Sequence, residues 1–178
     1  MYKNRHADKK QYEKYKKRFQ NLFDNPRTNE AVYKAAKMML QHRDGTPFED
    51  MYLIDEATGA IVGVSNSDSK VKGVVYNSSI KKALEEYGKN TLIALHNHPQ
   101  GFPPSASDLN AVWNNEAVRC GMTIGHNGTI YKYTQPKKMI KPEVYERAFK
   151  SFKEQGYSEV TCQENALQDE YDFKLEVL

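Results

Sequence analysis

Two histidines separated by one residue are the clearest chemical feature of the sequence. His96 and His98 directly follow the apolar run 91–95, which is predicted to be a buried strand. Side chains two residues apart in a strand point to the same face, so both imidazoles should lie on one side of the strand end. Two ring nitrogens placed in this way could bind one metal ion.

A carboxylate with suitable spacing follows the histidines. The loop 99–104 is rich in glycine and proline and leads to Ser105, which is predicted to cap a helix that carries Asp108 one turn later. The prolines stiffen the loop, so the carboxylate can return to the histidines at a low entropy cost. Two imidazoles and one carboxylate are typical of catalytic zinc, which keeps a position for water. We therefore predict that His96, His98 and Asp108 bind Zn²⁺; the alternative is a polar loop with incidental histidines.

Alternating helices and strands are predicted to position these residues. The patterns predict helices over 8–23, 29–42, 79–87, 106–119, 142–154 and 158–170, strands over 51–54, 60–64, 71–76, 91–95, 122–126 and 129–133, and a strand or extended tail over 171–178. This order indicates an α/β fold in which a mixed β-sheet is flanked by helices, with extra helices at both ends. We expect an N-terminal helical extension (1–44), a core (45–135) and a C-terminal helical extension (136–178).

Composition limits the classes of protein to be considered. The chain has 178 residues, a net charge of +3 and two cysteines, too few for a disulfide framework. Neither a signal peptide nor an apolar run of membrane-spanning length is visible, so we expect a cytoplasmic protein without a membrane partner. The first twenty residues are basic and the last twenty acidic. The basic segment could contact nucleic acid, but a solvated helix face is the favoured interpretation.

Four further residues are predicted to have structural and not chemical roles. Cys120 is predicted to be a small buried residue at a helix end, and Trp113 to lie in the core. His126 precedes an Asn-Gly turn and is predicted to be exposed. Asn97 lies between the two histidines and should face away from them, where it would fix a loop by hydrogen bonding.

The whole motif resembles that of a known enzyme family. His-x-His-Pro at 96–99 followed by Ser-x-x-Asp at 105–108 is similar to the motif of the JAMM (JAB/MPN+) metallopeptidases. The resemblance covers about 48–133 and is nearest to the RadC-like branch and to the JAB domains of phage head-morphogenesis proteins. It implies a JAB/MPN-like (cytidine-deaminase-like) fold. The spacer between the second histidine and the aspartate has nine residues, where the family usually has ten.

The resemblance also implies an activity and roles for individual residues. Members of the family hydrolyse peptide or isopeptide bonds with a zinc-activated water, and some act on ubiquitin-like modifiers. By this resemblance His96, His98 and Asp108 would hold zinc, Ser105 would stabilise the oxyanion, and an upstream glutamate would be the general base. The expected partner is a protein or peptide substrate, such as a ubiquitin-like or phage structural protein.

The position of the glutamate is the main departure from the family pattern. RadC-like sequences carry it on the strand that here spans 60–65, where no acidic residue is present. Other members carry it at the start of an earlier strand, where Glu49 fits. Asp50 is shorter and should face the other way, and Glu56 lies in a turn. We therefore predict Glu49 as the base; otherwise it is an exposed carboxylate before a strand.

Two other functions compete with hydrolysis. The chain could be an inactive metal-binding JAB scaffold that assembles partners through its charged ends. It could also be associated with nucleic acid, as RadC-like proteins suggest, although no groove-reading or base-stacking element is visible.

Overall fold

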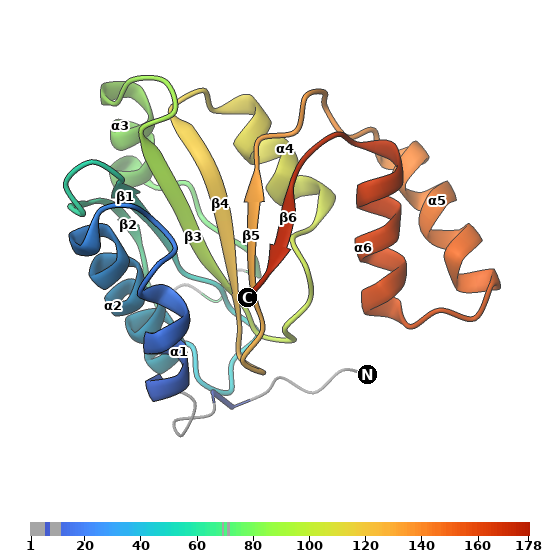
Figure 1. Ribbon diagram of the computed structural model, residues 1–178, viewed down its shortest axis with the longest axis horizontal. Helices are drawn as coiled ribbons and strands as arrows, with labels where there is room; N and C mark the ends of the chain where they lie inside the picture. The colour runs from blue at the N-terminus through green and yellow to red at the C-terminus, as the bar shows by residue number, and fades with distance from the viewer. Residues whose placement is uncertain (1–5, 8–11, 69, 71) are drawn as a thin grey trace.

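The protein has a mixed α/β architecture in which helices flank a six-stranded sheet (Figure 1). The computed structural model describes residues 6–7, 12–68, 70 and 72–178. Its elements are α1 (Tyr12–Phe19), α2 (Pro26–His42), β1 (Met51–Asp55), β2 (Ile61–Ser65), α3 (Ser78–Glu86), β3 (Leu92–His98), α4 (Ala106–Asn114), β4 (Val118–Gly125), β5 (Ile130–Thr134), α5 (Pro142–Glu154), α6 (Glu159–Glu170) and β6 (Leu175–Val177). The predicted fold class, a mixed sheet flanked by helices, is confirmed at this level.

Strand β3 lies inside the sheet and carries both histidines of the motif. The strand order is β2-β1-β3-β4-β5-β6, with β3 and β4 parallel and all other pairs antiparallel. Met51 of β1 is paired with His96 of β3. Met51 is the first residue of β1, so the residues just before β1 lie beside the end of β3. Side chains of both strands alternate between the two faces of the sheet with a period of two.

Hydrophobic side chains cover both faces of the sheet. On one face, α2 packs against alternate residues of β1 and β3, including Tyr52 and Ile93. On the other face, α3, α4 and α6 pack against the intervening residues, including Leu53 and Ala94. Every residue of β3 is buried, as expected for a strand covered on both sides. The alternation fixes which face each residue at the end of β3 takes.

Two predicted elements differ from the structure in type over part of their length. The predicted helix 106–119 ends at Asn114, and residues from Val118 onward form β4. Asparagine side chains at the end of α4 compete for backbone hydrogen bonds, which favours the end of the helix there. The segment that follows pairs in parallel with β3 and so becomes part of the sheet. The predicted strand 71–76 is not a strand over its described part, 72–76. Gly73 has a φ of 87° there, which interrupts an extended strand.

The N-terminal helices begin differently from the prediction. Residues 8–11 of the first predicted helix lie outside the described part. Within that part the helix is α1, which ends at Phe19 and not at 23 as predicted. Helix α2 starts at Pro26, earlier than predicted, because the side chain of Asn25 accepts a hydrogen bond from the Arg27 amide and caps it. Thr28, just before the predicted start of this helix at 29, would have been a possible cap by residue type, but it is buried within the helix and donates its hydroxyl to the Glu56 carbonyl.

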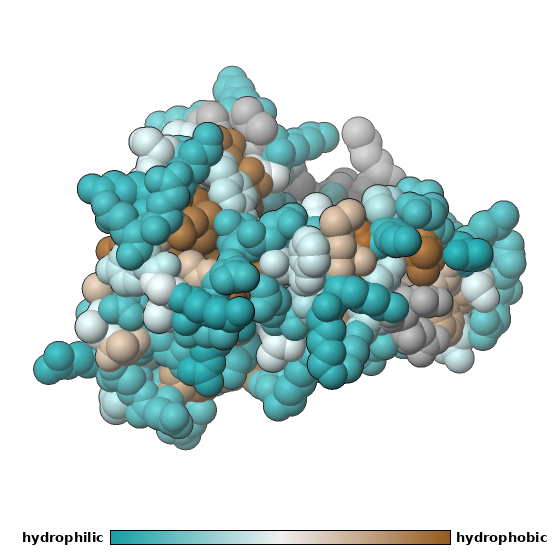
Figure 2. Space-filling view, turned by 90° about the horizontal axis from the view of Figure 1, so that it is seen from above, coloured by the Kyte–Doolittle hydropathy of each residue, from teal (hydrophilic) through white to brown (hydrophobic). Residues whose placement is uncertain are grey.

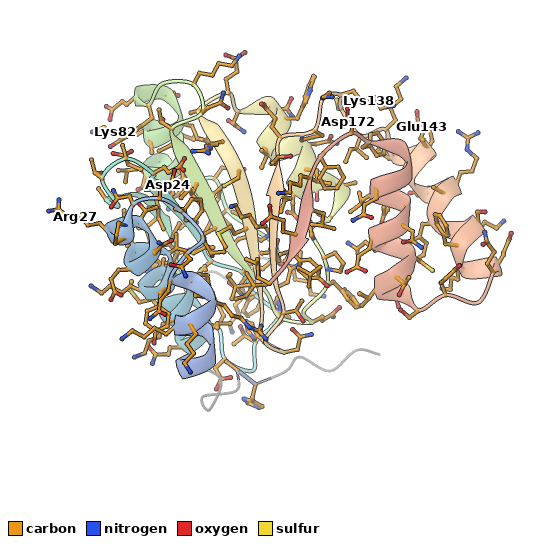
Figure 3. The ribbon with its side chains drawn as sticks, in the orientation of Figure 1. Asp24, Arg27, Lys82, Lys138, Glu143 and Asp172 are labelled. Carbon is orange, nitrogen blue, oxygen red and sulfur yellow. The ribbon has the colours of Figure 1, made fainter. Side chains whose placement is uncertain are left out.

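The outer surface is predominantly polar on the face seen in Figure 2, where hydrophobic residues form only small separate areas. Charged side chains such as Arg27, Lys82 and Glu143 project outward from the helices (Figure 3). Within the described residues, none of the helices combines the length and apolar character needed to cross a membrane.

Candidate metal centre

The alternation of β3 directs both motif histidines to one face. Leu92 and Ala94 pack toward α3 and α4, so His96 and His98 continue the same row. Both are largely buried, with 4% and 9% of their surfaces exposed. The strand therefore places the two imidazoles side by side, as predicted from their spacing, and their Nε2 atoms are 3.0 Å apart.

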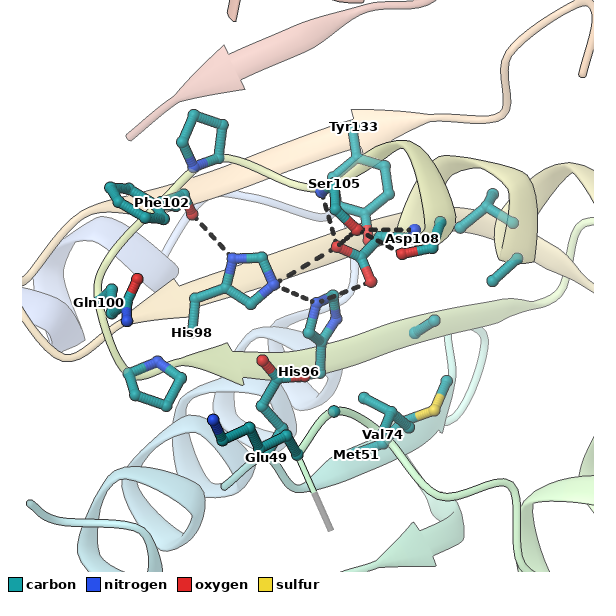
Figure 4. Close-up of a pocket in the computed structure, with 18 of the residues that line it drawn as sticks. Glu49, Met51, Val74, His96, His98, Gln100, Phe102, Ser105, Asp108 and Tyr133 are labelled. Atoms are coloured by element: carbon teal, nitrogen blue, oxygen red, sulfur yellow. Dashed lines mark hydrogen bonds and ion pairs between the residues drawn. The ribbon is translucent and has the colours of Figure 1, made fainter. Parts of the chain in front are cut away.

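Asp108 reaches the same point from the first turn of α4. Ser105 is the N-cap of this helix and accepts a hydrogen bond from the Asp108 amide. The Asp108 carboxylate in turn accepts bonds from the Ser105 amide and hydroxyl, both at 2.7 Å. This reciprocal capping box fixes the carboxylate where the loop ends. Its oxygens lie 3.5 Å from Nε2 of His96 and 3.4 Å from Nε2 of His98 (Figure 4).

The three donor groups have the spacing that a single small metal ion needs. Zinc binds imidazole nitrogen and carboxylate oxygen at about 2.0–2.2 Å, so ligand atoms around a tetrahedral ion lie about 3.3–3.6 Å from one another. Two of the three observed separations fall in this range, and the Nε2–Nε2 distance is slightly shorter. The residues present therefore fit a divalent metal with nitrogen and oxygen ligands.

The tautomer of His98 suits a metal ligand. Its Nδ1 lies 2.9 Å from the Phe102 carbonyl, and since a carbonyl can only accept, Nδ1 carries the proton. Nε2, the other ring nitrogen, points toward His96 and Asp108 and is the atom that would bind a metal ion. A carbonyl that orients a metal-binding imidazole in this way is a common supporting contact in metal sites.

Glu49 lies beside the two histidines on the same face of the sheet (Figure 4). One of its carboxylate oxygens and the histidine ligand atoms all lie within 4.8 Å of one another. Glu49 precedes Met51 by two residues, and Met51 is paired with His96, so the strand alternation directs Glu49 toward the histidines. The sequence pattern favoured Glu49 over Asp50 and Glu56 as the carboxylate of the site. In the structure Glu49 is the one of these three that lies beside the histidines.

The other two carboxylates lie elsewhere. Asp50 faces the opposite side of the sheet, where it is fully buried and paired with Arg43 and His42. Glu56 follows the end of β1 that pairs with Leu92, far along β3 from the histidines, and forms an ion pair with Arg119.

Burial and charge act in opposite directions on the carboxylates of the site. Burial raises the pKa of Glu49, although the nearby His96 and His98 oppose this rise. Burial also acts to raise the pKa of Asp108, but the two histidines outweigh it and hold that pKa well below its usual range. Glu49 is thus the carboxylate more easily protonated, which suits a proton acceptor, and Asp108 the one kept ionised, which suits a ligand.

A pocket of about 520 Å³ opens above these groups. Its walls combine the polar centre with apolar side chains, including Val74, Phe102 and Tyr133. The Tyr133 ring lies directly over Gly121, where an added Cβ would come within 2.2 Å of the ring. Gly121 therefore allows this tyrosine to reach the pocket from β5.

His126 and Trp113 lie differently from the prediction, whereas Cys120 and Asn97 largely agree with it. His126 was predicted to be exposed but is fully buried, because β4, which it follows, runs beside β3. Nε2 of His126 lies 3.0 Å from the side-chain amide nitrogen of Asn97. Trp113 was predicted in the core and is 37% exposed. Cys120 is buried as predicted, within β4 rather than at a helix end. Asn97 faces away from the histidines, as predicted, and bonds to the backbone of 48–50.

Gln163 of α6 also lines the pocket, although no sequence pattern indicates this. A glutamine in the middle of a helix has no local signal for such a role, and only the packing of α6 against the motif loop brings it there.

Comparisons with known proteins add no assignment, since no family model, curated protein or solved structure matches this chain.

Proposed function

We propose that this chain is a zinc-dependent hydrolase of peptide or isopeptide bonds, with a JAB/MPN-like core and a JAMM-type centre. The observation that supports it most is the convergence of three ligand groups at single-metal spacing with one further carboxylate, Glu49, beside them. The motif at 96–108 gave the same assignment by its resemblance to the family.

In this proposal each residue has a defined task. His96, His98 and Asp108 hold the ion, and the Phe102 carbonyl keeps His98 in the correct tautomer. When bound, zinc lowers the pKa of a water ligand to about 7 and polarises the substrate carbonyl. Glu49 accepts the proton of the attacking water and returns it to the leaving amine.

The substrate side of the proposal rests on the pocket. Its apolar walls beside a polar centre suit a polypeptide whose side chain packs while its carbonyl faces the ligands. We propose a protein substrate, with ubiquitin-like and phage structural proteins as the classes suggested by the resemblance.

An inactive metal-binding scaffold is the second candidate. The Ser105 hydroxyl is occupied as a helix cap and as a donor to Asp108, which explains this residue without any catalysis. A protein that binds zinc fully yet leaves peptide and isopeptide substrates intact would support this candidate. A nucleic-acid function receives less support, because Arg18 of the basic α1 donates to the carbonyls of Gly128 and Leu178.

Metal binding is the first test of the proposal. Purified protein should contain about one zinc per chain, and His98→Ala should weaken zinc binding at least about 100-fold because one of three ligands is lost. Isothermal titration after chelator treatment measures this change. His6→Ala is the matched control, since His6 is exposed and lies outside the pocket. Equal affinities of the His98→Ala variant and the unchanged protein would refute the ligand assignment.

The proposed part of Ser105 in hydrolysis can be separated from its part as a helix cap. Ser105→Ala should lower the free energy of unfolding by about 1 kcal/mol, as for other N-cap losses, and should also slow hydrolysis. Ser158→Ala removes the comparable cap of α6 outside the pocket and should cost similar stability without changing the rate. Urea unfolding and initial rates measure both effects. If the two variants hydrolyse substrate equally well, Ser105 is only a cap.

A further inference from the structure

The loop between His98 and Ser105 is held by helix α6. The side-chain amide nitrogen of Gln163 donates to the carbonyls of both Pro103 and Pro104, each at 3.2 Å. Gln163 is buried, with 9% of its surface exposed, and the two prolines are buried as well. Breaking this contact would leave buried carbonyl groups without the amide that now satisfies them.

These two carbonyls belong to the segment that orients a metal ligand. The carbonyl of Phe102, adjacent to Pro103, accepts a hydrogen bond from Nδ1–H of His98. Ser105, adjacent to Pro104, begins the helix that presents Asp108. A shift of the loop at 103–104 would therefore move the acceptor of His98 and the capping box together.

A second contact ties the same helix to the C-terminal part of the chain. Asn110 of α4 donates to the Ile140 carbonyl at 2.9 Å and accepts from the Ile140 amide at 2.7 Å. Cys162 and Leu167, near Gln163 on α6, are fully buried, so the face of α6 that bears Gln163 is fixed against the protein. The residues after 135 thus contact the loop and the helix on either side of Ser105.

We propose that Gln163 is a positioning residue of the metal centre: its amide fixes the 102–105 loop so that the Phe102 carbonyl holds His98 with Nε2 free to bind the metal. This inference rests on the proposed function, because it assigns Gln163 to the same site. Gln163 does not itself reach a ligand atom. Its effect passes through backbone carbonyls to the orientation of one imidazole.

The test compares Gln163→Met with Gln168→Met. Methionine has nearly the length of glutamine but no amide, and Gln168 lies exposed on the same helix. Gln163→Met should weaken zinc binding about tenfold, the lower range for loss of a supporting contact, whereas Gln168→Met should bind zinc like the unchanged protein. Titration with zinc alone measures this. Nitrogen-15 NMR of the metal-free proteins at pH 8 should show His98 protonated at Nδ1 in the unchanged protein and a mixture of tautomers in Gln163→Met.

The outcomes separate this inference from the proposed function. Unchanged zinc affinity and an unchanged His98 tautomer in folded Gln163→Met would overturn the positioning role. If Gln163→Met does not fold, Gln163→Asn, which keeps an amide but is too short to reach both carbonyls, should show the same two changes, and their absence would overturn the role. Zinc binding without hydrolysis in the unchanged protein would refute only the proposed function, whereas no zinc binding at all would overturn both.

Discussion

Glu49→Gln is expected to reduce hydrolysis by about 10²–10⁴-fold while zinc remains bound. The amide keeps the size of the side chain but cannot accept the proton of the attacking water. Zinc should stay because the proposed function assigns the ion to His96, His98 and Asp108, whose donor atoms have single-metal spacing. Single-turnover rates on a peptide or isopeptide substrate, with zinc content measured on the same sample, give both quantities.

The matched control for Glu49 is its neighbour in the chain. Asp50→Asn makes the same chemical change one residue away, on the opposite face of the sheet, and should leave the rate of the folded protein close to normal. Undiminished hydrolysis by Glu49→Gln would show that another group accepts the proton. Loss of zinc from Glu49→Gln would instead make Glu49 a ligand.

Asp50→Asn is expected to lower the free energy of unfolding by about 3–5 kcal/mol. Asp50 is fully buried, with one carboxylate oxygen 2.5 Å from Nε of Arg43 and the other 2.7 Å from Nδ1 of His42. The Arg43 side chain is only 6% exposed, so removal of the carboxylate charge leaves a buried guanidinium without its counter-ion. Urea unfolding followed by circular dichroism measures the loss.

A second readout checks the cause of this loss. The hydrogen bond to Asp50 is the main reason that the pKa of His42 is raised, so this pKa should fall in Asp50→Asn, as an NMR titration can show. Asp55→Asn is the control, because Asp55 accepts bonds in an exposed turn and should cost much less. A similar loss of stability in both variants would contradict a special role for the buried pair.

The arrangement of the histidines was predictable from local spacing alone. His96 and His98 lie two apart after an apolar run, and the strand period of two places both on one face. The same alternation predicted that Asn97 and Asp50 would face away from the centre, which the structure confirms. The capping of α4 by Ser105 was likewise readable from the Ser-x-x-Asp pattern, because capping depends on neighbours in sequence.

Features that depend on distant pairing were not predictable in this way. The segment from Val118 reads as the end of a helix until its parallel pairing with β3 is known. His126 reads as an exposed turn residue until that pairing buries it. Gln163 contacts a loop about sixty residues earlier in the chain, which no local pattern encodes. Single-sequence patterns therefore predicted the orientation of residues on a strand better than the partners of each element.

The sheet order has a consequence for how the chain emerges from the ribosome. Strand β3 pairs with β1, which is made earlier, and with β4, which is made later. Until β4 is synthesised, one edge of a strand whose every residue is buried in the finished protein has no partner. An unpaired apolar edge readily joins another chain, so the nascent protein passes through an aggregation-prone stage. For β3 this stage lasts until residues 118–125 leave the ribosomal tunnel, and the open edge then passes to β4 until β5 pairs with it.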